Sequence, residues 1–188
     1  LRSGIPAYRL PRAVLDREVA RVEAAGVRLK LGRRFETDFG WGDLTGYAAV
    51  FLATGAGRER GLEIPGAPRE ALVGGLALLA ELNGGRGSVL GDRVAVVGGG
   101  NTAMDAVRTA VRLGARRARL IYRRSEAEMP ARVEEVKHAK EEGVEMMMLT
   151  NPVAFLGDEK ERLRAGRFMR MELGEPDDSG RRRPIPIA

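Results

Sequence analysis

The residue string best suited to chemistry is a glycine-rich turn that follows four apolar residues, Val94–Val97, and opens a segment of helical apolar spacing. In such a strand–turn–helix unit Gly98 permits the tight turn, Gly100 lets the backbone approach a diphosphate, and Ala103 lets the helix pack closely. The free N–H groups at the helix start would face the diphosphate, together with two polar side chains. The turn therefore predicts a dinucleotide site at Gly98, Gly99, Gly100, Asn101, Thr102 and Ala103.

Two arginines follow the next predicted strand, where the preferred coenzyme is usually selected. Dinucleotide-binding units that prefer NAD carry an Asp or Glu about 20 residues after the glycine-rich turn, and this carboxylate binds the ribose 2′-hydroxyl. Here Ile121-Tyr122 is followed by Arg123 and Arg124. Paired guanidinium groups can clamp a 2′-phosphate through charge-assisted, bidentate hydrogen bonds. Arg132 is near enough in sequence to join them. The predicted coenzyme is NADPH rather than NADH.

Composition limits the other chemistry available to these residues. The chain has no cysteine, which excludes disulfides, thiolate metal sites and iron–sulfur clusters here. Its one histidine, His138, lies in a charged helical stretch, so catalysis by histidine is not expected. We predict no metal ligand, and no catalytic residue, because bound cofactors would carry the chemistry. The net charge of +6 comes from dispersed arginines without interleaved aromatic residues, so no nucleic-acid partner is expected. No apolar run reaches the length of a membrane span.

The elements around the glycine turn predict an α/β fold. From Arg93 the signals alternate between strand and helix, which implies a Rossmann-like parallel sheet with flanking helices. The expected elements are Val94–Val97, Asn101–Leu113, Ala118–Tyr122, Ala131–Glu142 and Val144–Thr150. At about residues 150–188, three short strands and two tight turns predict a small antiparallel β-meander. Its expected strands are Pro152–Leu156, Leu163–Leu173 and Arg182–Ile187.

The first 57 residues have a different pattern. We expect a helix at Pro11–Ala25, a half-buried strand at Val27–Leu31 and a buried parallel strand at Tyr47–Ala53. Ala56–Glu70 is rich in Gly, Pro and charge and predicts an interdomain crossing, followed by a helix at Ala71–Leu82. The expected domains are therefore 1–57 and 58–188.

The string YRRSEAEMPAR (Tyr122–Arg132), after VVGGGNTAMDAVRTAVRLGA, resembles the NADPH domain of the glutamate synthase small-subunit family. Gly4–Val19, Ala49–Gly57 and Leu149–Glu159 resemble the same family in the same order, so the resemblance covers nearly the whole chain. Val133, where the family often has proline, is a local departure. Members of the family are FAD- and NADPH-dependent oxidoreductases. The pattern also occurs in dihydropyrimidine dehydrogenase and in bifurcating ferredoxin:NADP oxidoreductases.

The resemblance implies an NADPH domain inserted into an FAD-binding domain, with residues 1–57 as an N-terminal remnant of the latter. It assigns FAD contacts to Arg9, to the backbone at Phe35, and to Thr54 and Gly55. Hydride would pass from NADPH to FAD in the cytoplasm. Electrons would continue to iron–sulfur centres or to a partner such as a large synthase subunit. The family's first G-x-G-x-x-G and its cysteines would precede Leu1, and the returning FAD segment would follow Ala188. We therefore expect these 188 residues to bind FAD poorly by themselves.

Other interpretations remain open. An NADP(H)-sensing regulatory Rossmann module would bind the coenzyme without hydride transfer, but it would not need the flavin-like segments Gly4–Val19 and Ala49–Gly57. An Arg-rich nucleic-acid-binding domain would show strongly salt-dependent retention and leaves the glycine turn unexplained. The turn could also be an ordinary strand–turn–helix, and the arginine pair two surface residues of an Arg-rich chain.

Overall fold

The structure is a computed structural model and describes residues 1–55, 57, 59, 61, 62, 64–66, 68, 71–87, 90–160 and 162–187. The chain divides into two units. The larger unit combines Leu1–Arg9 with Arg60–Ala188, and the smaller unit is Leu10–Glu59. The division falls close to the expected boundary after residue 57, but the first nine residues belong to the larger unit.

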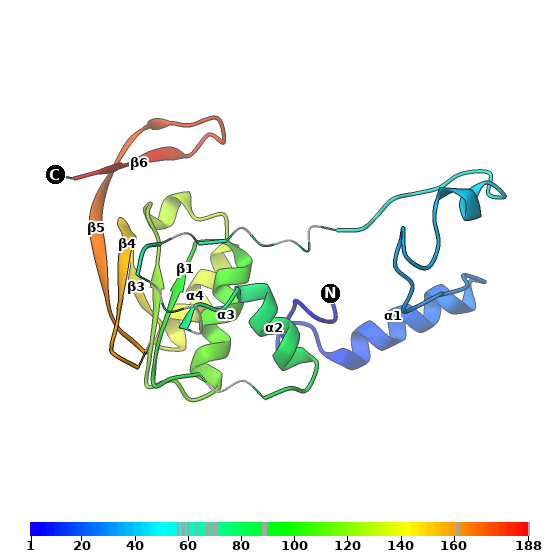
Figure 1. Ribbon diagram of the computed structural model, residues 1–188, viewed down its shortest axis with the longest axis horizontal. Coiled ribbons are helices and arrows are strands. Elements are labelled where there is room, and N and C mark those ends of the chain that lie inside the picture. Colours follow the sequence, from blue (N-terminus) through cyan, green and yellow to red (C-terminus); the bar gives the residue numbers. More distant parts are fainter. Residues whose placement is uncertain are drawn as a thin grey trace. The chain divides into compact units, whose positions relative to one another are not determined.

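A three-stranded parallel sheet forms the centre of the larger unit (Figure 1). The order β1-β2-β3 joins β1 (Arg93–Val97), β2 (Arg117–Ile121) and β3 (Glu145–Met147). The connecting helices are α3 (Asn101–Arg112) and α4 (Val133–Glu141). These elements follow the predicted alternation of strand and helix, and the α/β class is confirmed. None of the helices in the described ranges is long and apolar enough to cross a bilayer.

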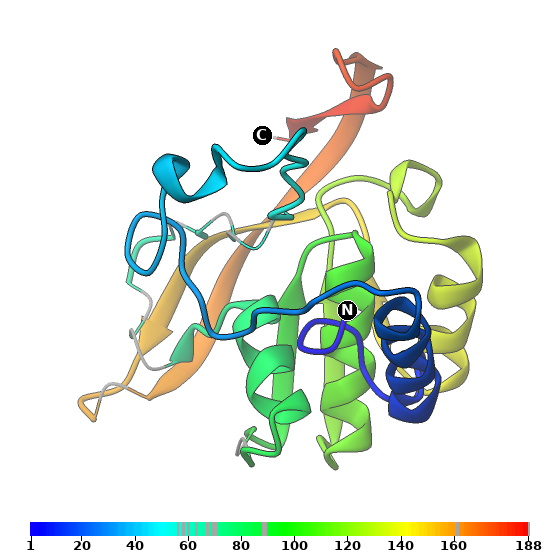
Figure 2. The same cartoon turned by 90° about the vertical axis from the view of Figure 1, so that its right-hand side faces the viewer.

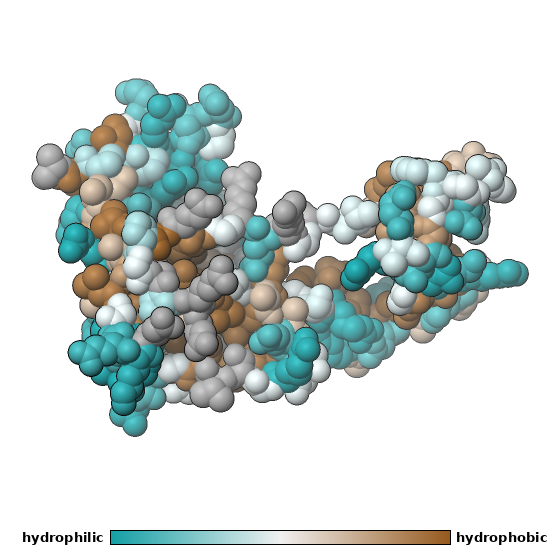
Figure 3. Space-filling view, viewed as in Figure 1, coloured by the Kyte–Doolittle hydropathy of each residue, from teal (hydrophilic) through white to brown (hydrophobic). Residues whose placement is uncertain are grey.

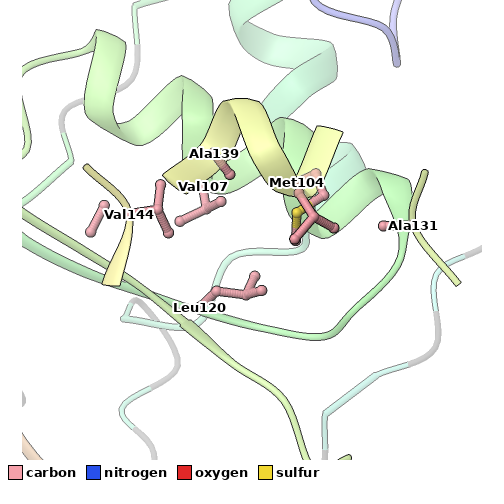
Figure 4. Close-up of a cluster of buried hydrophobic side chains, with 8 residues drawn as sticks. Met104, Val107, Leu120, Ala131, Ala139 and Val144 are labelled. Carbon is pink, nitrogen blue, oxygen red and sulfur yellow. The ribbon is translucent and has the colours of Figure 1, made fainter. Parts of the chain in front are cut away.

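The core lies between the two crossover helices and β2 (Figure 4). Met104 and Val107 are three residues apart on α3, so they share a face and are fully buried. They pack in one cluster with Leu120 from β2 and Ala139 from α4. Burying a side chain such as Leu, Val or Met contributes about 1.5–3 kcal/mol relative to leaving it exposed. This packing fixes α3 against the sheet, and with it the glycine turn at the start of α3.

An antiparallel sheet lies on the side of the parallel sheet opposite the helices (Figures 1 and 2). It comprises β4 (Thr150–Gly157), β5 (Leu163–Pro176) and β6 (Arg182–Pro186), in the order β4-β5-β6. The predicted meander is confirmed, and β5 is longer than expected because it continues through an irregular register beyond Leu173. The N–H of Thr150, the first residue of β4, donates to the carbonyl of Tyr122, which directly follows β2, at 3.0 Å.

The smaller unit contains α1 (Arg12–Ala24), as expected, and a 3-10 helix, η1 (Trp41–Leu44). Both strands expected in this unit are wrong. Val27–Leu31 and Tyr47–Ala53 have no strand structure, and Phe51 is 91% exposed. A strand needs a neighbour to take up its backbone hydrogen bonds. Among the described strands none pairs with either segment, so their apolar patterns alone do not make them strands.

The expected crossing Ala56–Glu70 lies in large part outside the described residues. Within it, the Pro65 carbonyl accepts a hydrogen bond from the N–H of Phe155 at 2.9 Å, so this part of the segment lies against β4. The helix expected from Ala71 begins later, as α2 (Gly75–Asn83), and packs against α3.

Candidate coenzyme site

The three glycines of the turn meet different steric demands. Gly98 has a φ of +141°, which residues with a side chain rarely adopt, and a Cβ there would lie 3.4 Å from the Cβ of Ala103. A Cβ on the buried Gly99 would come within 2.6–2.8 Å of the Tyr122 ring. A Cβ on Gly100 would meet nothing within 4 Å. The fold itself requires the first two glycines, whereas the space at Gly100 is open to a ligand.

The start of α3 offers free hydrogen-bond donors. Gly100 is the N-cap, and its carbonyl accepts the N–H groups of Ala103 and Met104 at 3.0 and 3.1 Å. The N–H groups of Asn101 and Thr102 have no acceptor within the part of the chain that is described, and both residues are exposed. Unbonded N–H groups and the positive end of the helix dipole together favour an anion such as a diphosphate.

The loop from β2 to α4 closes against the glycine turn and brings Arg132 to it. The N–H of Ala131 donates to the Gly99 carbonyl at 3.1 Å. The N–H of Arg132 donates to the side-chain oxygen of Asn101, also at 3.1 Å. The Arg132 side chain is exposed. Its positive charge is thus exposed beside the first turn of α3, and its binding of the 2′-phosphate stays a prediction.

The two arginines that follow β2 have opposite surroundings. The N–H of Gly98 donates to the carbonyl of Ile121 at 3.0 Å, so the chain leaves β2 beside the glycine turn. Arg123 is exposed, and its guanidinium has no partner among the residues described. Arg124 is only 4% exposed. The structure therefore brings Arg123 and Arg132 to the turn as exposed cations and places Arg124 in the interior.

The buried Arg124 is held by the turn that joins β5 to β6. Its Nε donates to the Arg182 carbonyl at 2.7 Å, and its guanidinium pairs with Asp177. The Arg182 side chain in turn donates to the buried Glu128 at 2.5 Å. Hydrogen bonds from Ser125 and Arg182 lower the pKa of Glu128.

Sequence reasoning missed this network because its members lie up to 58 residues apart. Two local signals pointed to parts of it. Glu128 follows Ser125 by three residues, and Asp177 precedes Ser179 in a tight turn, where hydrogen bonds from Ser179 lower the Asp177 pKa. Neither signal identifies Arg124 as the partner.

Arg9, predicted to contact FAD, lies in the larger unit against α3. Its guanidinium bonds both carboxylate oxygens of Asp105 at 2.7 and 2.8 Å and pairs with Glu135 at 3.0 Å. Burial raises the pKa of Asp105, and the hydrogen bond from Arg9 opposes that shift. The charge of Arg9 is neutralised by these two carboxylates, so the assigned FAD contact stays a prediction.

The other predicted FAD contacts lie in the smaller unit. Phe35 makes edge-to-face contacts with Phe39 and Trp41, at ring-centroid distances of 5.4 and 5.0 Å. Thr54 is exposed, and Gly55 has a φ of +73°, as a sharp turn requires. Within the described ranges no group of three or more acidic or histidine side chains could hold a metal ion.

Comparison with known proteins assigns the family. Residues 9–175 match the family model described as pyridine nucleotide-disulphide oxidoreductase. This match covers most of the chain, and the protein belongs to that family.

Individual relatives agree with this assignment. The chain is 46% identical to the NADP(+)-dependent formate dehydrogenase subunit beta of Moorella thermoacetica, over 98% of this chain and 26% of that protein. It is 44% identical to the NADPH-Fe(3+) oxidoreductase subunit beta of Geobacter sulfurreducens, over 98% of this chain and 28% of the relative. It is 38% identical to a putative glutamate synthase [NADPH] small chain of Cereibacter sphaeroides, over 96% of this chain and 46% of that protein. The chain thus spans between about a quarter and a half of each relative's length.

Proposed function

We propose that this chain is the NADPH-binding part of a flavin-dependent oxidoreductase of the glutamate synthase small-subunit type, acting in the cytoplasm. NADPH would pass hydride to FAD, and electrons would continue to iron–sulfur centres or to a partner such as a large synthase subunit. The observation that carries the proposal is the open space at Gly100 beside two exposed arginines, Arg123 and Arg132. The names of the three relatives, which refer to NADP(+) or NADPH, support it.

The chain's own residues would bind and orient the coenzyme. The diphosphate would lie at the start of α3, where the N–H groups of Asn101 and Thr102 are free and Gly100 presents no side chain. The 2′-phosphate would bind the exposed guanidinium groups of Arg123 and Arg132. FAD, when bound, supplies the acceptor for the hydride. No side chain of this chain needs to act as an acid or a base.

The proposal extends to the FAD contacts and partners that this part of the protein would share with the rest of the molecule. Phe35, Thr54 and Gly55 would lie beside the flavin nucleotide in the full-length protein, and Arg9 would reach it from the N-terminal segment. The remaining FAD-domain segments would complete that site. The relatives are named as subunits or small chains, which supports a partner that receives the electrons.

Anaerobic reduction of the flavin in the full-length protein tests this function. NADPH should bleach the flavin absorbance, and NADH should do so only at much higher concentration. Arg123→Gln should raise the NADPH concentration needed for half-maximal rate and leave that for NADH unchanged. Tight NADPH binding without bleaching would favour the alternative function, an NADP(H)-sensing module without hydride transfer.

A further inference from the structure

The buried Arg124 raises a question that the proposed site leaves open. Adjacent arginines after β2 predict a double clamp on the 2′-phosphate, yet only Arg123 is exposed. Arg124 has a side-chain exposure of 5%, and the carboxylate that neutralises it, Asp177, is itself 23% exposed. To reach a coenzyme phosphate, the guanidinium would have to leave Asp177 and the Arg182 carbonyl together. Leaving the Arg182 carbonyl of this part-buried contact and a partly buried carboxylate without partners is costly.

Hydrogen bonds connect Arg124 to the β5–β6 hairpin and connect that hairpin back to the loop that contains Arg124. From Arg124 they run to Asp177 and Arg182 in the β5–β6 hairpin (residues 163–186). From Arg182 they return to Glu128, which also accepts the hydroxyl of Ser125. The hairpin is therefore bonded to the loop between β2 and α4 (residues 122–132) at two points, Arg124 and Glu128, on either side of Ser125. Figure 3 shows that the turn end of this hairpin has a mostly hydrophilic surface.

The same loop also contacts the glycine turn. Tyr122, which precedes the arginines, packs its ring against Gly99 and donates its hydroxyl to the Glu128 carbonyl at 2.9 Å. The backbone of Arg124 is fixed as well, because its carbonyl accepts the N–H of Leu149 at 3.0 Å. Arg123 thus lies between two neighbours held by hydrogen bonds, while its own side chain is exposed and has no hydrogen bond or ion pair among the described residues.

We propose that Arg124 is a positioning residue: it sets the preference for NADPH through Arg123 and does not itself touch the 2′-phosphate. Asp177, which is distant in sequence, would have the same positioning role, since it holds the guanidinium of Arg124 in place. This inference rests on the proposed function, because it presupposes that Arg123 binds the 2′-phosphate of NADPH. The positioning role and a direct bond from Arg124 to the 2′-phosphate predict different changes in coenzyme preference when Arg124 or Asp177 is substituted.

The test measures the ratio of the NADH to the NADPH dissociation constant in the full-length protein. Arg123→Gln should lower this ratio but leave it above one, because the exposed Arg132 still binds the 2′-phosphate. Arg124→Gln and Asp177→Asn should each lower it measurably, but by less than Arg123→Gln does, and an unchanged ratio in both would overturn the proposal. The Arg123→Gln/Arg124→Gln double variant should have the same ratio as Arg123→Gln alone, because Arg124 acts through Arg123. Arg183→Gln is the matched control: it removes one exposed charge from the same hairpin and should leave the ratio unchanged.

A different set of results would show that Arg124 binds the 2′-phosphate directly. Asp177→Asn would then free a cation and raise the ratio, Arg124→Lys would keep it, and the double variant would fall below Arg123→Gln alone. Those results overturn the role of Arg124 but keep the proposed function. A wild-type ratio near one overturns both. If Arg124→Gln does not fold, Asp177→Asn decides by the direction in which the ratio changes.

Discussion

Gly99 and Gly100 are adjacent, yet the structure constrains them differently. A Cβ at Gly99 would collide with the ring of Tyr122, which is buried and hydrogen-bonded. We expect Gly99→Ala to lower the free energy of unfolding by about 1–3 kcal/mol, because ring and backbone must shift. Gly100→Ala should cost no more than about 1 kcal/mol, since the site is open and only the capping preference changes.

Denaturant unfolding measures both variants, and coenzyme titration separates the two roles. Gly100→Ala should weaken NADPH binding although it folds normally, because its methyl group enters the space proposed for the diphosphate. Equal losses of stability in the two variants would contradict the steric argument.

The carboxylate of Asp158 makes the stability of the fold depend on pH. Asp158 lies in the turn after β4, where its carboxylate accepts the backbone N–H groups of Lys160 and Arg162 at 3.0 and 2.9 Å. The hydrogen bond from the Arg162 backbone is the main reason that the pKa of Asp158 falls from 3.8 to about 2. Because the folded state favours the ionised form, this carboxylate stabilises the fold above the ordinary pKa. That stabilisation is lost as pH falls from 3.8 towards 2.

Asp158→Asn should therefore lower the melting temperature at pH 7, and the difference from wild type should shrink as pH falls from 3.8 and vanish only below pH 2. Thermal melts across this range measure the effect, with Glu159→Gln as a neighbouring exposed control. A difference that stays constant with pH would mean that the charge of Asp158 has no part in it.

At the scale of elements, α3 and α4 are joined by ion pairs as well as by the apolar core. Arg108 is 5% exposed and bonds Glu135 at 2.5 Å and Glu142 at 2.8 Å. Arg108→Met should destabilise the larger unit by about 3 kcal/mol, because two poorly hydrated carboxylates lose a partner. Arg112 bonds the same Glu142 from a far more exposed position.

Arg112→Met should consequently cost no more than about 1 kcal/mol. Chemical denaturation of both variants gives the comparison. Comparable losses for the buried and the exposed arginine would refute the role assigned to burial.

The fold was predictable wherever an element finds its neighbours within the chain. The strands and helices from Val94 to Thr150 have clear periods, and each strand pairs with another from the same stretch. Val27–Leu31 and Tyr47–Ala53 have comparable apolar patterns but no described partner strand, and they are not strands. Apolar patterning reports a tendency to be buried, whereas strand structure also depends on a partner for the backbone.

The candidate site was likewise predictable only where its features depend on local sequence. The glycine turn before α3 and the exposed Arg123 after β2 depend on local sequence, and their part in binding stays a prediction. The burial of Arg124 depends on Asp177 and Arg182, more than 50 residues away, and no local pattern reveals that pairing.

At the scale of the whole molecule, the chain spans less than half the length of each of the three relatives described above, and the apolar run Tyr47–Ala53 is exposed. We expect this run to be covered in the full-length protein by the remaining FAD-domain segments. Hydrogen exchange should then be slow at the amides of Val50, Phe51 and Leu52 in the full-length protein and fast in residues 1–188. Fast exchange in both would contradict the expectation that FAD-domain segments cover this run.

The central claim is that the glycine turn and Arg123 bind NADPH in preference to NADH. The most direct measurement is a pair of equilibrium titrations of the full-length wild-type protein with the two coenzymes under identical conditions. We predict that NADPH binds at least about tenfold more tightly, which corresponds to about 1.4 kcal/mol for recognition of the 2′-phosphate. Equal affinities, or tighter binding of NADH, would contradict the account.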